Sequence, residues 1–463
     1  MTARTLWEKI RGSHPFGGCG CPASGIDFRV DRTAGSSAEP AGGSARARTT
    51  NPCSRVQMLQ RQLRPSEPIG QRQSGRASPR QVSLAARCLG SAVLAVLSVV
   101  ATFALCEMLL RLAWTPPSLR STQAFEPHPV YGVAPIPGIA GVRHTVEYAH
   151  PFAHTPQGFR AGSALGVVAA HKRAPRVLFL GDSFTYGMGV ADDETFVNRV
   201  AAALPGVEVV NAGVNGYGQF EELALLDALG PALRPDLTVV VFFWNDLEDN
   251  LEAGAPSFTV DSDGRVVRTD LVVPAAFDPL ASRTGHVERP SARGPLYYTR
   301  ELVKEGLKGV RYRYLGISAR DIQTEEQLRQ AWTVAANAFE LLLRRAREVG
   351  SRLLVISIPD HNKVDPLAVI KNIEPLNYDV EDALRETLLR LGVPYFDTFD
   401  ALRSAHESGE GGLYYYADRH LTPRGHRVLA DALLPVVAAE LTAAVERRSG
   451  VPSPPAAGAG GGP

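Results

Sequence analysis

Four short stretches of the sequence carry polar residues of the kinds that nucleophilic catalysis needs. They are Gly181-Asp182-Ser183, residues 211–216 (NAGVNG), Asn245-Asp246 and Asp418-Arg419-His420. A serine becomes a nucleophile when a histidine takes its proton, and a carboxylate holds that histidine in the right tautomer. Ser183, His420 and Asp418 supply this set. The developing oxyanion needs fixed N–H donors, and the candidates are the Ser183 and Gly216 backbone amides and the Asn245 side-chain amide.

The first three stretches each follow a segment that the sequence predicts to be a buried β-strand. These segments are 176–181, 207–213, whose last three residues overlap the second polar stretch, and 237–244. The last is a continuous run of β-branched and aromatic residues, which is typical of a strand buried on both faces. Open α/β sheets bind ligands at the carboxyl ends of their strands. The polar residues therefore follow the strands at the edge where such a sheet carries its active site.

Helices alternate with these strands along the rest of the chain. We predict helices at 194–204, 221–229, 324–349 and 380–391 and after Thr422-Pro423, with further strands at 353–358 and 393–399. A capping box from Thr324 to Gln327 opens the third helix, and Thr422-Pro423 supplies an N-cap and a first-turn proline for the last. This alternation predicts one α/β domain at 175–449 with a mostly parallel sheet. Residues 251–322 interrupt it as an insertion, with an Asp-Gly hairpin at 258–270 and a basic stretch at 298–314.

Together the four stretches resemble the sequence blocks of the SGNH/GDSL hydrolase family of serine esterases. Gly181-Asp182-Ser183 resembles the first block of the family. Gly216 matches the glycine of the second block, with Gly213 as the lesser candidate, and Asn245 in WND matches the asparagine of the third block. Asp418, His420 and the following LTPRGH resemble the fifth block. The resemblance covers 181–426. It implies a flavodoxin-like three-layer α/β/α sandwich, a Ser183–His420–Asp418 triad, an oxyanion hole of Ser183, Gly216 and Asn245, hydrolysis of acyl esters, and no metal or cofactor.

One feature departs from the commonest family pattern. The aspartate usually stands three residues before the histidine, whereas Asp418 is two residues before His420, and no acid occupies 413–417. A shorter Asp-x-His form followed by a Leu-Thr…Gly-His tail resembles membrane-anchored bacterial members. We therefore keep Asp418 as the triad carboxylate.

Each candidate residue also has a purely structural interpretation. Ser183 is a residue type that caps helices, His420 is compatible with a buried structural histidine, and Asn245 is compatible with a strand-end turn. Asp182, Asp246 and Asp249 are interpreted as residues that order their own loops, and His426 as a packing residue of the last helix. The acids near 246 are too few for a hard-metal site, so no metal is expected.

An apolar segment precedes the predicted domain. Residues 89–110 contain Glu107 as their only charge and would span roughly 33 Å as a helix, enough to cross a hydrocarbon core. Residues 1–87 carry fourteen Lys and Arg against five Asp and Glu, and 88–463 carry 35 against 43. The basic flank favours a single-pass signal anchor at 88–111, with a cytoplasmic N-terminus and a periplasmic catalytic domain. A buried core helix and a cleaved signal peptide are the alternatives; a start at Met58 would place the segment nearer the N-terminus.

The remaining segments are interpreted by composition. Residues 1–87 are predicted to be a disordered basic arm, 112–174 a linker or accessory region with short strands, and 450–463 a disordered tail. All five cysteines lie before residue 107, so the body needs no disulfide and has no thiol nucleophile. The arm has few aromatic residues, and the adjacent apolar segment explains its charge, so no nucleic-acid partner is expected.

Three functions are compatible with these residues. The first is hydrolysis of an acyl ester, with envelope carbohydrate or lipid esters as the substrate class. The second is an O-acyltransferase that uses the same triad to acylate a polysaccharide. The third is a carbohydrate-binding module that has lost catalysis, although such a module has no use for Ser183, Asn245, Asp418 and His420 together. The sequence contains no feature that separates the first two.

Overall fold

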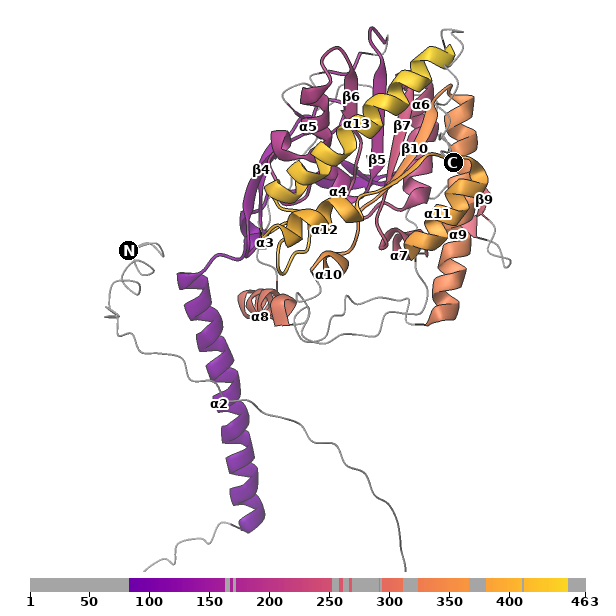
Figure 1. Ribbon diagram of the computed structural model, residues 1–463. Helices are drawn as coiled ribbons and strands as arrows, with labels where there is room; N and C mark the ends of the chain where they lie inside the picture. Colours follow the sequence, from indigo (N-terminus) through magenta and orange to yellow (C-terminus); the bar gives the residue numbers. More distant parts are fainter. Residues whose placement is uncertain are drawn as a thin grey trace, which may run out of the picture. The chain divides into compact units, whose positions relative to one another are not determined.

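Figure 1 presents a computed structural model of the chain. It describes residues 83–162, 167–169, 172–251, 258–260, 266–268, 291, 294–310, 324–365, 380–409 and 412–448. The predicted arm before residue 83, the predicted tail and most of the predicted insertion lie outside the described residues.

The centre of the body is a five-stranded sheet in which every neighbouring pair is parallel. Its strands are β5 (Arg176–Gly181), β6 (Glu208–Asn211), β7 (Leu237–Phe242), β10 (Arg352–Ser357) and β11 (Tyr395–Asp397). Their order across the sheet is β11-β10-β7-β5-β6. The mostly parallel α/β fold predicted from the sequence is thus confirmed.

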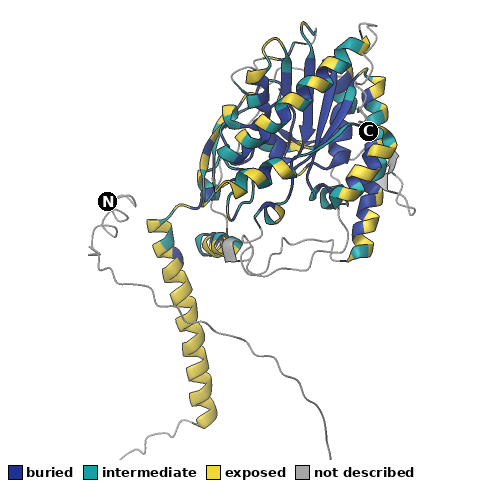
Figure 2. Cartoon of the chain, viewed as in Figure 1, coloured by how far each residue is buried: buried dark blue, intermediate teal, exposed yellow. Residues whose placement is uncertain are grey.

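Helices cover both faces of the sheet, so the body has three layers (Figure 1). One face packs against α6 (Gln219–Leu233), α9 (Glu325–Glu348) and α11 (Val380–Leu391), and the other against α5 (Phe196–Ala203), α12 (Phe399–Glu407) and α13 (Pro423–Arg448). Alternate side chains of β5 point to opposite faces of the sheet. Leu178 and Leu180 belong to the core on the side of α6, α9 and α11, and Val177 and Phe179 belong to the core on the side of α5, α12 and α13. The strands are therefore buried on both sides, as their apolar runs predict (Figure 2).

Several local predictions are confirmed. Thr324 caps α9, with its Oγ1 accepting from the Gln327 amide at 3.1 Å, and the Thr422 hydroxyl accepts from the Gly425 amide at the start of α13. The hairpin predicted at 258–270 contains β8 (Phe258–Val260) and β9 (Val266–Arg268), which pair antiparallel, and its Asp-Gly turn lies outside the described residues. The shorter elements are η1 (Asp192–Glu194), α4 (Ser183–Tyr186), α7 (Asp246–Leu251), α8 (Tyr297–Val310) and α10 (His361–Val364).

Residues 112–162 contain two hairpins that pack on the body. After α3 (Pro117–Arg120), β1 (Phe125–His128) pairs with β2 (Gly132–Pro135), and β3 (Ala140–His144) pairs with β4 (Ala149–Ala153). Arg160, fully buried behind them, donates to Asp192 at 2.6 Å and to the Val190 carbonyl at 2.9 Å. These bonds join the region to the segment that follows β5 and α4.

The helix α2 (Leu84–Ala113) precedes this region and leaves its apolar side chains exposed (Figure 2). In the described part of the chain two helices, at Leu84–Arg120 and Pro423–Arg448, are long and apolar enough to cross a membrane. The second of these is α13, whose Leu429, Leu433 and Val437 are buried against the sheet. In α2, by contrast, Glu107 is the one residue that is buried among the described residues.

Candidate active site

Ser183 lies at the switch point of the sheet. It is the first residue of α4, which follows β5 after Asp182, and β5 stands between β6 and β7. The chain leaves β5 to form β6 on one side and then crosses to form β7 on the other, which is where open α/β sheets bind their ligands. Gly216 follows β6 and Asn245 follows β7. The three predicted oxyanion residues therefore follow adjacent parallel strands at the same sheet edge.

The structure brings the three predicted triad residues together. His420 Nε2 is 2.7 Å from Ser183 Oγ, and His420 Nδ1 is hydrogen-bonded to Asp418 Oδ1. Ser183 is 7% exposed, and the His420 and Asp418 side chains are 19% and 20% exposed. The serine is thus withdrawn from bulk water but reachable from one side. These contacts match the relay in which a histidine takes the proton of a serine while a carboxylate fixes its tautomer.

The short Asp-x-His spacing is accommodated by a left-handed turn. Arg419, between the two residues, has φ 68°, an uncommon conformation for a side chain of this size. Its guanidinium donates to Asp360 at 3.0 Å and to Asn362, while the Tyr415 amide donates to the His420 carbonyl at 2.9 Å. The turn brings the Asp418 carboxylate and the His420 imidazole into contact, although they are only two residues apart.

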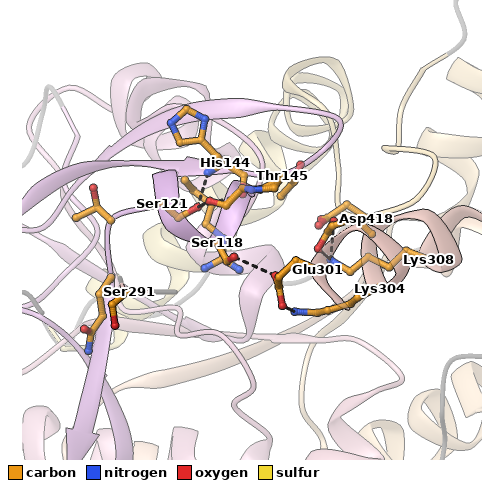
Figure 3. Close-up of a pocket in the computed structure, with 14 residues that line it drawn as sticks. Ser118, Ser121, His144, Thr145, Ser291, Glu301, Lys304, Lys308 and Asp418 are labelled. Atoms are coloured by element: carbon orange, nitrogen blue, oxygen red, sulfur yellow. Dashed lines mark hydrogen bonds and ion pairs between the residues drawn. The ribbon is translucent and has the colours of Figure 1, made fainter. Parts of the chain in front are cut away.

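The Asp418 carboxylate is held in its ionised form. Burial acts to raise its pKa, but the hydrogen bond with His420, the charge of His420, the nearby Tyr148 hydroxyl and the Lys308 ammonium outweigh burial. The pKa of Asp418 therefore lies below its ordinary value. Lys308 extends from α8 toward this carboxylate (Figure 3). An ionised aspartate here favours the His420 tautomer whose Nε2 is free to accept a proton.

The turn before Ser183 requires glycine and aspartate. Gly181 has φ 153°, and a Cβ there would lie 2.2 Å from the Thr185 hydroxyl. Asp182 caps α4 by accepting from the Phe184 amide at 2.8 Å, which agrees with the turn-ordering role expected for it. The Phe184 ring packs against the His420 ring, with centroids 5.0 Å apart. Nucleophile and base are therefore both fixed by one short turn.

The candidate oxyanion donors differ in how they are engaged. The Ser183 amide is in the first turn of a helix, where N–H groups have no helical acceptor. The Gly213 amide is taken by Asn211 Oδ1 at 3.1 Å, whereas the Gly216 amide donates to no group in the described part of the chain. Asn245 donates to Asp249 at 2.7 Å, which uses one of its two amide hydrogens. Gly216 is therefore better suited than Gly213 to receive an oxyanion.

A cluster of buried acids supports this edge of the sheet. Asp246, interpreted from the sequence as ordering its own loop, accepts from the Phe243 amide and from Gln219 Nε2 at 2.7 Å. Burial, together with the charge of Asp182, raises the pKa of Asp249 to about 7 and that of Asp246 well above its ordinary range. Glu222 is fully buried, and its carboxyl has no hydrogen-bond partner in the described residues. The sequence around these acids gives no sign of such burial.

We expect Glu222→Gln to stabilise the protein increasingly as pH rises. Burial raises the pKa of Glu222 well above 4.5, so above that pH the folded state retains a proton that the unfolded chain releases. Wild-type stability then falls with rising pH by at most about 1.4 kcal/mol per unit, and glutamine has no such proton. Urea unfolding of both proteins from pH 5 to pH 8 measures the difference. Glu326→Gln, at a side chain 84% exposed, is the control, and equal behaviour of both variants would contradict the expectation.

Glu147 was missed by sequence reasoning and holds the loop that carries the triad. Its carboxylate accepts hydrogen bonds from three consecutive backbone amides, those of Tyr416 at 2.8 Å, Ala417 at 2.9 Å and Asp418 at 2.6 Å. Glu147 stands in the turn between β3 and β4, where the Thr145 hydroxyl accepts from the Glu147 amide. No local pattern marks it, because its partners are about 270 residues away in sequence.

Comparison with known proteins assigns the family. The model of the GDSL-like lipase/acylhydrolase family matches residues 179–428, more than half of the chain. A comparison with curated proteins found no match. Among solved structures, the chain is similar to a protein of the lipolytic G-D-S-L family from Veillonella parvula DSM 2008, with 14% identity and a TM-score of 0.31 over 57% of this chain and 98% of that one. It is also similar to a catalytic mutant of an acetylxylan esterase from Geobacillus stearothermophilus, with 12% identity and a TM-score of 0.33 over 59% and 96%.

The family match contains the β5 turn with Ser183, the loops after β6 and β7, and the Asp418–His420 turn. The family predicted from the four sequence blocks is thus confirmed. This protein is an ester-cleaving hydrolase of the GDSL-like lipase/acylhydrolase family.

Proposed function

We propose that the protein cleaves acyl esters with Ser183 as nucleophile, His420 as general base and Asp418 as the carboxylate that orients His420. The contact that carries this proposal is the 2.7 Å separation of His420 Nε2 from Ser183 Oγ, with Asp418 on the other ring nitrogen. Three side chains in this order have the chemistry of an activated serine.

The proposed reaction has two steps. Ser183 Oγ attacks the carbonyl carbon of the ester and its proton passes to His420 Nε2; the ester C–O bond then breaks, and the alcohol leaves with that proton. Water repeats the sequence on the acyl-enzyme: His420 takes a proton from water, hydroxide adds to the carbonyl, and Ser183 leaves with the proton as the acid is released. The Ser183 and Gly216 amides and the Asn245 side chain are proposed to stabilise the oxyanion of both steps.

We further propose that α2 anchors the enzyme as a single-pass signal anchor at 88–111. The basic arm at 1–87 then stays in the cytoplasm, and the hydrolase domain at 175–449, with its accessory region at 112–174, lies on the extracytoplasmic side. The support is the exposed apolar surface of α2 and the excess of positive charge before it. In that position the substrates at hand are esters of envelope carbohydrate or lipid.

A fluorophosphonate probe tests the activated serine. We expect the full chain in detergent to be labelled and the Ser183→Ala variant to be unlabelled, while Ser404→Ala, an exposed serine on α12, labels as wild type does. A folded wild-type protein that resists the probe would contradict the triad assignment and favour a binding module. Product analysis with an acetyl ester, with and without a sugar acceptor, then separates hydrolysis from acyl transfer.

A further inference from the structure

The helix α8 exposes its apolar side chains and buries its acidic ones, which is the reverse of the usual arrangement in a surface helix of a soluble protein. Leu302, Val303 and Leu307 are 46%, 53% and 56% exposed. Glu301, by contrast, is 4% exposed and the Glu305 side chain 9% exposed. A surface helix of a soluble protein buries its leucines and exposes its glutamates. α8 does the reverse, so the exposed side of the helix carries leucine and valine side chains while its glutamates are buried.

The N-terminus of α8 is attached to the end of α2 by a buried charge. Glu107 accepts from the Tyr298 amide at 3.1 Å, from the Thr299 amide at 2.8 Å and from the Thr299 hydroxyl at 2.9 Å, and Arg111 donates to it as well. A carboxylate is favoured at a helix N-terminus, where N–H groups lack helical partners. Glu107, the only charged residue of 89–110, is thereby paired with α8 and with Arg111.

The position of this contact along α2 corresponds to the edge of a bilayer. From Leu89 to Glu107 the helix rises roughly 27 Å, close to the ~30 Å thickness of a hydrocarbon core. α8 contacts α2 at Glu107, near the end of α2 that leads into the body, and both helices leave apolar side chains exposed. Beside the apolar side of α8 stand the exposed cations Arg300 and Lys304, with side chains 70% and 56% exposed.

We infer that α8 lies on the bilayer surface, with Leu302, Val303 and Leu307 among the acyl chains and Arg300 and Lys304 at anionic phospholipid headgroups. Interfacial helices carry an apolar side flanked by basic residues in this way. The inference requires α2 to cross the membrane but does not depend on the proposed catalysis. α8 then fixes how the catalytic body faces the membrane, beyond merely tethering it.

This placement also brings the active site close to the lipid surface. Glu301, Lys304 and Lys308 of α8 line a pocket of about 510 Å³, and Asp418 of the proposed triad lines the same pocket (Figure 3). Ser118 donates to Glu301 at 2.9 Å and joins this side of α8 to α3. One short helix therefore separates Asp418 from the proposed bilayer surface.

Depth-dependent quenching tests the inference on the full chain. In a chain whose five native cysteines are replaced by serine, single cysteines are placed at Leu307 on α8, Leu97 on α2 and Leu389 on α11, and each carries an environment-sensitive fluorophore. Leu389 is the matched control because it is an exposed leucine of the body, 79% exposed. The proteins are reconstituted in phosphatidylcholine–phosphatidylglycerol vesicles that contain lipids spin-labelled near the headgroup or near the acyl-chain end. Thermal unfolding of each variant verifies its fold.

We expect the Leu307 probe to lose about half of its fluorescence to the shallow spin label, since interfacial helices sit ~5–10 Å into the headgroup boundary. The Leu97 probe should respond most to the deep label, and the Leu389 probe to neither. If the Leu307 probe behaves like the Leu389 probe while the Leu97 probe is quenched, the inference about α8 is overturned, and the proposal that α2 crosses the membrane still stands. A blue-shifted Leu307 probe that resists both labels would show a protein cover, such as a second copy, and would overturn it too. Absence of quenching at Leu97 would show that α2 does not cross the membrane and would overturn the inference about α8 as well.

Discussion

Replacing His420 with alanine is expected to lower kcat for ester hydrolysis by about 10⁴- to 10⁶-fold, as loss of the base does in other serine hydrolases. Without the imidazole, nothing at 2.7 Å takes the Ser183 proton, and the serine remains a weak nucleophile. KM should change little, because the imidazole contributes to the transition state more than to substrate binding. Steady-state kinetics with a chromogenic acetyl ester measure both constants.

His406→Ala is the control for this substitution. His406 lies on α12 with its side chain 30% exposed and makes no hydrogen bond to the triad in the described residues. Asp418→Asn should cost about 10²- to 10⁴-fold in kcat, because the amide no longer favours the required tautomer of His420. Retention of wild-type kcat by the His420 variant would disprove its role as base, whatever the result at Asp418.

Replacing Glu147 with glutamine is expected to lower kcat by about 100-fold with little change in KM, since a displacement of ~1 Å in a catalytic group can cost this much. Its carboxylate holds three successive amides, including that of Asp418 at 2.6 Å. A neutral amide accepts fewer and weaker bonds than a carboxylate. The Asp418–His420 turn should then sample positions in which Nε2 no longer faces Ser183. Glu147 is thus a positioning residue.

Gln157→Ala separates positioning from general stability. Gln157 makes two hydrogen bonds of 2.7 Å to Val168 in the same N-terminal part of the body but does not contact the catalytic turn. Both variants should unfold at lower temperature than wild type, yet only Glu147→Gln should lose kcat and react slowly with the fluorophosphonate. Equal kcat in the two variants, at a temperature where both are folded, would show that Glu147 has a structural role alone.

The strands and helix ends whose formation depends on residues close together in the chain could be predicted from the sequence. Apolar runs of strand length predict β5 and β7, and side-chain caps at Thr324 and Thr422 predict where α9 and α13 begin. These signals are readable because strand burial and helix capping involve residues only a few positions apart. The polar motifs at successive strand ends then led to the family, since a parallel sheet places those ends on one edge.

Features that depend on distant contacts could be decided only by the tertiary structure. The sequence around Glu147 does not predict that this residue holds the catalytic turn. The sequence around Glu222 does not predict a buried carboxyl that has no hydrogen-bond partner in the described residues. The sequence shows the segment that contains α8 only as a basic stretch. Which side of α8 faces the body follows from long-range contacts such as the hydrogen bond from Ser118 to Glu301. The sequence by itself determined the sheet, the helix caps and the order of the reactive residues, because each of these depends on residues that are close together in the chain. Folding decided which of those residues touch, because burial and long-range hydrogen bonds exist only when distant segments meet.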